Sequence, residues 1–61
     1  MKNLYLVTLN SDTHILIVAS SKDVVGDYCL PVMQFGECVE SIEFIAVVGG
    51  DYKEGEILKK I

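Results

Sequence analysis

The stretch Thr13–Leu30, THILIVASSKDVVGDYCL, decides the fold of this chain. It begins with an apolar, mostly β-branched run, His14–Ala19, which is typical of a strand that is buried on both faces. Two serines follow, and after them the apolar residues are spaced as on one side of a helix. We therefore expect a central strand that leads directly into the only helix.

The helix is expected to begin at the serines. Ser20 followed by Asp23 resembles a capping box, in which a serine hydroxyl accepts a hydrogen bond from a free backbone N–H group. Pro31 disfavours a helical conformation at Leu30. The predicted helix therefore runs from Ser21 to Leu30, and its apolar side consists of Val24, Val25, Tyr28 and Cys29.

Two strands are expected beside the central one. Leu4–Leu9 is too short for a helix and rich in strand-forming residues, and the polar turn 10–12 joins it to His14–Ala19 as an antiparallel hairpin. Val39–Val48 is the third strand. Strict alternation along it would place Ile42, Phe44, Ala46 and Val48 on one face and Ser41, Glu43, Ile45 and Val47 on the other.

The end of the chain allows two interpretations. Ile57, Leu58 and Ile61 fit one turn of a helix, whereas residues 56–58 also suit a short edge strand. Lys59 and Lys60 are compatible with both, as cations near a helix end or as charges that deter further strand pairing. The sequence leaves the two open.

Length and composition indicate one small folded domain, residues 1–61. Apolar residues make up 51% of the chain, far more than a disordered segment contains. The predicted fold class is α+β, with a small antiparallel sheet of three or four strands in ββαβ order and one short helix on one face. Such a helix leaves the other face of the sheet uncovered, and exposed apolar patches usually mark association sites.

The compartment is expected to be the cytoplasm. The apolar run Leu4–Leu9 is too short for a signal peptide, and no run approaches the length of a membrane span. Cys29 and Cys38 are expected to be unbridged and buried or half-buried, as small hydrophobic residues in a reducing compartment.

The charge pattern disfavours direct binding to nucleic acid. The net charge is −4, eight acidic residues lie between Asp23 and Glu56, and the chain has no arginine to neutralise phosphates. The acids form either a solvated face or a face directed at a basic partner. The second reading includes an acidic inhibitor that imitates nucleic acid.

No combination of residues points to catalysis. His14 alone has a reference pKa near neutrality, and no nucleophile stands in a known relation to it. The spacing of His14, Cys29 and Cys38 matches no zinc pattern, and Gly49–Gly50 lacks the lysine of a phosphate-binding loop. We expect a protein that is not an enzyme and that has no metal or cofactor.

The segment Pro31–Cys38, PVMQFGEC, reads as an ordered loop. Its large apolar residues either close the edge of the core or present an adhesive surface, since Met and Phe suit adaptable interfaces. The third strand adds apolar residues and acids that could contact a partner. The candidate partner-binding residues are Val32, Met33, Phe35, Glu40, Glu43, Ile45 and Val47.

Residues 1–25, MKNLYLVTLNSDTHILIVASSKDVV, resemble the opening of many small proteins encoded by bacteriophages and other mobile elements. The resemblance implies a small α+β accessory protein that binds or inhibits a host protein or defence factor, in the host cytoplasm, and it transfers no site residues. We therefore expect a non-enzymatic protein-binding module. The alternatives are a homodimer or larger homo-oligomer with a small-ligand site at the subunit junction, and the acidic inhibitor described above.

Overall fold

Strand β2, His14–Ala19, lies inside a four-stranded antiparallel sheet, between β1 (Lys2–Leu9) and β4 (Ile57–Lys60). Strand β3, Val39–Val48, pairs with the other side of β1, so the strand order is β3-β1-β2-β4. The computed structural model describes all 61 residues. It confirms the α+β fold and the predicted hairpin, and it shows that the end of the chain forms an edge strand rather than a helical turn.

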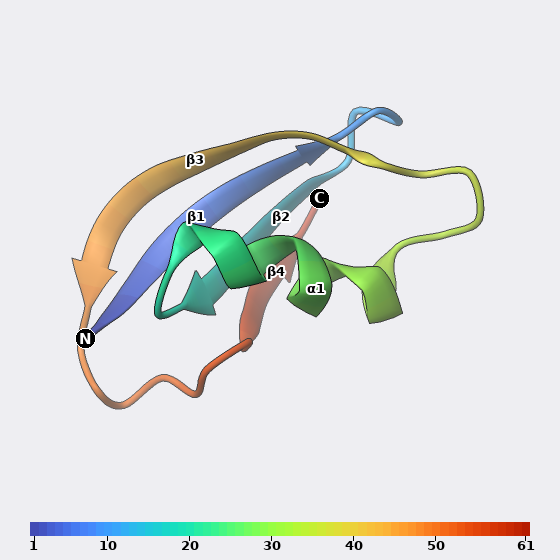
Figure 1. The fold of residues 1–61 in the computed structure, drawn as a ribbon. Coiled ribbons are helices and arrows are strands. Elements are labelled where there is room, and N and C mark those ends of the chain that lie inside the picture. Colours follow the sequence, from blue (N-terminus) through green and yellow to red (C-terminus); the bar gives the residue numbers. More distant parts are fainter.

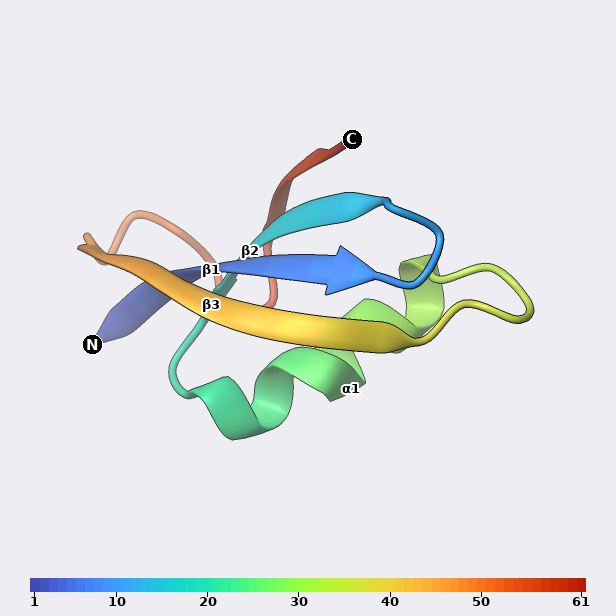
Figure 2. The same ribbon diagram turned by 90° about the horizontal axis from the view of Figure 1, so that it is seen from above.

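The helical segment covers one face of the sheet only (Figures 1 and 2). Its α-helical part is short: α1 spans Val25–Cys29, between the 3₁₀ turns Lys22–Val24 and Leu30–Val32. The α-helix ends one residue before the predicted end at Leu30, but Leu30 itself is helical and Pro31 occupies the first turn of the second 3₁₀ segment. A proline is tolerated there, since the N–H group that it lacks would have no partner in a first turn.

The predicted cap at Ser20 is wrong. Neither Ser21, which precedes the first 3₁₀ turn, nor Val24, which precedes α1, makes a side-chain capping bond. The Ser20 hydroxyl instead donates a hydrogen bond to Glu54, far along the chain. The Ser20 hydroxyl therefore bonds to Glu54 instead of capping the helix.

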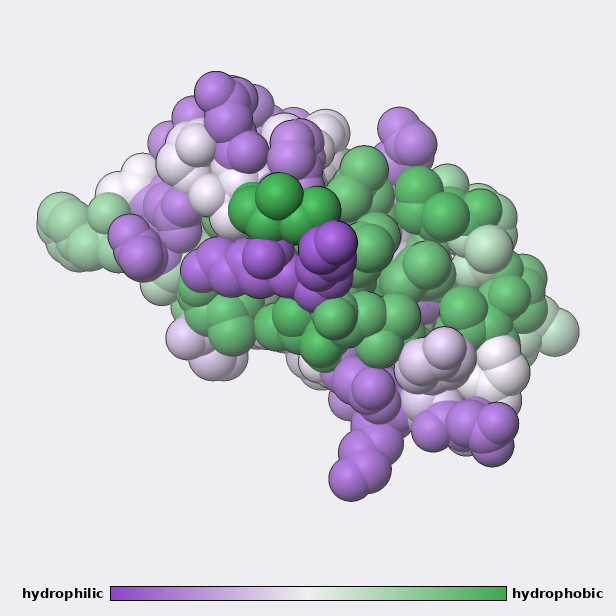
Figure 3. All heavy atoms as spheres, turned by 180° about the vertical axis from the view of Figure 1, so that it is seen from behind, coloured by the Kyte–Doolittle hydropathy of each residue, from purple (hydrophilic) through white to green (hydrophobic).

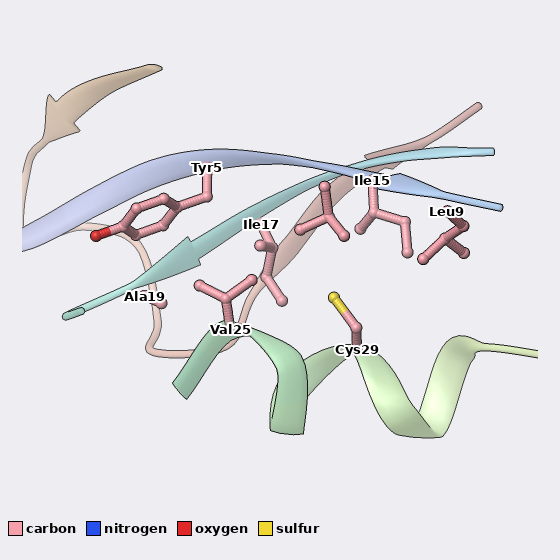
Figure 4. Packing of buried hydrophobic residues seen from close by; sticks show 8 residues of the cluster. Tyr5, Leu9, Ile15, Ile17, Ala19, Val25 and Cys29 are labelled. Carbon is pink, nitrogen blue, oxygen red and sulfur yellow. The ribbon is translucent and has the colours of Figure 1, made fainter. Parts of the chain in front are cut away.

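The core lies between α1 and one face of the β1–β2 pair (Figure 4). The alternate residues of both strands point into it, as period-two geometry requires. Burial raises the pKa of the Cys29 thiol, whereas Cys38 is exposed, contrary to expectation, and the two are unbridged. The core cluster consists of Tyr5, Val7, Leu9, Ile15, Ile17, Ala19, Val25 and Cys29.

Bulges interrupt the pairing of β3 with β1. Leu4 pairs with Ala46 and Tyr5 with Phe44, so Ile45 is an extra residue on β3. A bulge of this kind shifts the alternation of side chains by one position. The predicted faces of β3 are therefore wrong beyond Phe44: Val47, not Ala46 or Val48, shares the helix side with Phe44, while Ala46 and Val48 lie on the opposite side.

The connection between β3 and β4 is bound to the end of β2. Glu54 Oε2 accepts hydrogen bonds from the Ser20 N–H group at 2.9 Å, the Ser20 hydroxyl at 3.0 Å and the Tyr28 hydroxyl at 2.9 Å. These bonds, the first of them most, lower the pKa of Glu54. The bond to Glu54 raises the pKa of Tyr28. The next residue, Gly55, donates its N–H to the Val18 carbonyl at 2.7 Å.

Gly55 is expected to be the glycine that tolerates substitution least. Its φ is +82°, and a Cβ there would lie 3.4 Å from ring carbons of Tyr28. Gly55→Ala should reduce the free energy of unfolding by about 1–2 kcal/mol, since left-handed backbone is unfavourable for residues with a Cβ. The control is Gly49→Ala, where no atom lies within 4 Å, with a change of less than about 0.5 kcal/mol. Urea unfolding would measure both, and equal losses would contradict this role.

The Glu54 contact predicts a pH dependence of stability. A carboxyl whose pKa is lowered by folding stabilises the protein above its usual pKa of about 4.5, and the contribution is lost as the pH falls through the lowered value. Glu54→Gln should therefore melt at a lower temperature than the wild type at pH 7, and the difference should narrow below pH 4.5. Asp51→Asn, in the same connection, is the control. A difference in melting temperature that stays the same at every pH would show that the charge of the Glu54 carboxylate does not stabilise the fold.

Candidate functional site

The surface has no enclosed pocket, and no three His, Cys, Asp or Glu side chains come together as metal ligands. None of the helices is long and apolar enough to cross a membrane. What stands out on the surface is exposed apolar side chains, and the most exposed of them belongs to Phe35.

Phe35 belongs to the loop of residues 33–38, which joins the helical segment to β3 and projects from one end of the molecule (Figures 1 and 2). The loop contains a turn in which the Glu37 N–H group donates to the Gln34 carbonyl at 3.0 Å. Gly36 is the third residue of the turn and has φ +89°, the conformation that a type II turn requires at this position. The turn leaves the Phe35 ring fully exposed.

Asn10, in the β1–β2 turn, holds the loop from the side. Its Nδ2 donates to the Gly36 carbonyl at 3.2 Å, and its Oδ1 accepts from the Cys38 N–H group at 3.1 Å. Its backbone N–H donates to the Cys38 carbonyl at 3.0 Å. Both sides of the turn are thus tied to the sheet through one residue.

Glu37 adds a second set of contacts, one inside the loop and one to the β1–β2 turn. Its Oε1 accepts from the Gln34 N–H group at 2.7 Å, and its Oε2 accepts from the Ser11 hydroxyl. These bonds, with the one from Gln34 the largest, lower the pKa of Glu37. Because its carboxylate is engaged within the chain, Glu37 acts as part of the support for Phe35.

The other apolar residues predicted in this loop have a different role. Val32 and Met33 are half-buried and pack against the core cluster. The Lys60 ammonium group donates to the Val32 carbonyl at 2.8 Å, which joins the start of the loop to β4. Val32 and Met33 therefore anchor the loop, and Phe35 alone of the three is presented to solvent.

The predicted residues on β3 do not form one surface. Val47 lies on the helix side of the sheet and Glu43 on the opposite side, while Ile45 and Glu40 are the extra residues at the two bulges. All four are exposed. The structure thus separates them into different faces, because each bulge changes the direction of the side chains that follow it.

Sequence reasoning missed Asn10 and Ser11 as supports of the loop. Both residues were predicted only as part of a turn, since Asn and Ser are common turn residues and need no further role to explain them there. Their contacts join residues 26 to 28 positions apart, and no local pattern signals such contacts.

No protein-family model, curated protein or solved structure matches this chain. The geometry around Phe35 is therefore the basis for a functional proposal.

The support given by Asn10 can be tested directly. Asn10→Ala removes both side-chain bonds to the loop, so hydrogen exchange of the Cys38 amide should accelerate by about fivefold, the effect of losing roughly 1 kcal/mol of protection. Asn3→Ala, which removes a bond to the Tyr5 hydroxyl, is the control and should leave the Cys38 amide unchanged. NMR-detected exchange would measure both. Unchanged protection in Asn10→Ala would mean that the loop is held by other contacts.

Proposed function

We propose that this chain is a non-enzymatic protein-binding module that inserts Phe35 into an apolar pocket of a partner protein. The observation that supports it is a fully exposed phenylalanine on a loop that hydrogen bonds hold in place. Burying a phenylalanine side chain is worth about 1.5–3 kcal/mol. In the chain alone the Phe35 ring stays in water, so its burial in a matching pocket of a partner would contribute this free energy to binding.

The loop also reduces the ordering that binding requires. Asn10 and Glu37 already fix the turn around Phe35, so a partner meets a formed surface rather than a flexible segment. Binding costs about 0.5–1.5 kcal/mol for each long side chain that must be immobilised, and preorganised loops avoid part of this cost. Aromatic anchors of this kind commonly dominate the binding energy of an interface.

The charge of this chain indicates what kind of partner it would bind. The net charge of −4 favours a partner whose surface around the pocket is neutral or basic, and it disfavours nucleic acid. The resemblance of residues 1–25 to small phage-encoded proteins supports a host protein or defence factor as the partner. The unbridged cysteines are compatible with a reducing cytoplasm.

The test compares two exposed apolar residues. The immobilised wild type, Phe35→Ala and Leu30→Ala proteins are incubated with a bacterial lysate, and the bound proteins are identified by mass spectrometry. Leu30 is the matched control because it too is exposed, at 62%, but belongs to the helical segment. We expect a protein that the wild type and Leu30→Ala capture and Phe35→Ala does not, with affinity reduced at least about tenfold.

The two variants must be equally stable for this comparison. Both side chains are exposed, so each substitution should change the free energy of unfolding by less than about 0.5 kcal/mol. If every captured protein binds Phe35→Ala as well as the wild type, Phe35 is not the anchor and the proposal fails.

A further inference from the structure

Four residues form one row across the face of the sheet that the helix leaves uncovered. Leu6 pairs with Glu43 on β3 and with Leu16 on β2, and Leu16 pairs with Lys59 on β4. Directly paired residues share a face, and Leu6 lies between Tyr5 and Val7, which point into the core. The row therefore reads Glu43, Leu6, Leu16, Lys59 from edge to edge, on the face opposite α1.

Apolar side chains continue on one side of this row, whereas the row on the other side, toward the end of β1, is polar and contains Ser41, Thr8 and His14. The next row toward the start of β1 contains Ala46, Leu4 and Val18. Figure 3, drawn from the side opposite the helix, shows a broad apolar area with hydrophilic side chains lying across and around it. Val18 is fully buried, Leu4, Leu6 and Leu16 are half-buried, and Ala46 is exposed, so part of this apolar area remains open to contact.

We propose that a second copy of this chain covers this face, giving a twofold symmetric dimer in which the two sheets pack face to face and the helices lie outside. The twofold axis runs between the sheets, parallel to the strands and between β1 and β2. This axis places the β3 edge of one copy over the β4 edge of the other. Such a contact is isologous and closes at two copies.

The charges in the row favour this axis. It puts Glu43 opposite the partner's Lys59, Leu6 opposite the partner's Leu16, and the reverse of each pair on the other side. An axis across the strands would instead place Glu43 over Glu43 and Lys59 over Lys59. Like charges facing each other in an interface are strongly unfavourable, so the row complements itself only in the first arrangement.

The dimensions are compatible with a dimer of ordinary size. A standard interface takes about 800 Å² from each partner, which is roughly a fifth of the 3893 Å² accessible surface of the chain. Aligned sheets cross at about 30°, and the long lysine side chain can span the resulting offset.

Pairing through the free edge of β3 is less well supported. The two bulges, at Glu40 and Ile45, break the regular row of backbone groups that a strand from another copy would need. A charged side chain pointing from an edge strand onto the sheet face, as Glu43 does, is a further device that deters edge pairing. Packing through the sheet face is therefore favoured over edge pairing, and the dimer interface does not include Phe35.

Charge reversal with rescue tests the dimer. Glu43→Lys and Lys59→Glu each place like charges together at two symmetric positions, and each should weaken the dimer on the order of tenfold or more. The double variant restores opposite charges and should restore the dimer. Within one chain the two residues lie three strand spacings apart, about 14 Å. Because this exceeds the screening length of about 8 Å at physiological salt, rescue must come from across an interface.

The measurement is the molar mass by light scattering over a dilution series from about 1 µM to about 1 mM, the range of weak to moderate affinities. The controls Glu40→Lys and Lys53→Glu change the net charge equally away from the row, and Phe35→Ala removes the proposed anchor. All three should dimerise like the wild type. Circular dichroism confirms that each variant is folded.

A wild type that stays monomeric throughout the series would overturn the proposal and leave the face to a different protein. A dimer that both reversals leave unchanged, or that Glu43→Lys tightens, would overturn it too. Loss of lysate capture in Phe35→Ala with an intact dimer would separate the two proposals, since they depend on different residues.

Discussion

The fold depends on the burial of one face of the β1–β2 hairpin beneath a very short helical segment. That segment covers only one face, and nine of the 61 residues are buried, eight of them in a single cluster. Small domains have little burial to offset the entropy of ordering the chain. Strands β3 and β4 extend the hairpin at its two edges, and the face opposite the helix keeps half-buried and exposed side chains around the buried Val18.

Hydrogen bonds between distant segments compensate for the small core. Glu54 ties the connection between β3 and β4 to Ser20 and Tyr28, and Asn10 ties the other long loop to the β1–β2 turn. Each contact uses a single side chain with several partners, so few residues are needed to order a long segment. At one end of the molecule these hydrogen bonds fix the loop that carries Phe35.

The two proposed surfaces have the same origin. A chain that is half apolar but has only one small core must leave apolar groups outside it. Two parts of this apolar surface are the basis of the proposals: a single aromatic side chain on a hydrogen-bonded loop, and the sheet face bordered by Glu43 and Lys59. The first suits a pocket in another protein, and the second suits a copy of itself, because the charges at its two borders are opposite.

The sequence by itself determined the α+β class, the hairpin and the positions of β2 and β3, because hydrophobic patterns and turn residues act over a few positions. It also indicated that Phe35 belongs to an ordered loop, and that apolar surface would remain. Only the tertiary structure decided that Val32 and Met33 pack inward, that Asn10 holds the turn, and that Glu43 and Lys59 lie in one row. These depend on strand register and on the bulge at Ile45, which are set by contacts between segments far apart in the chain and leave no local signal.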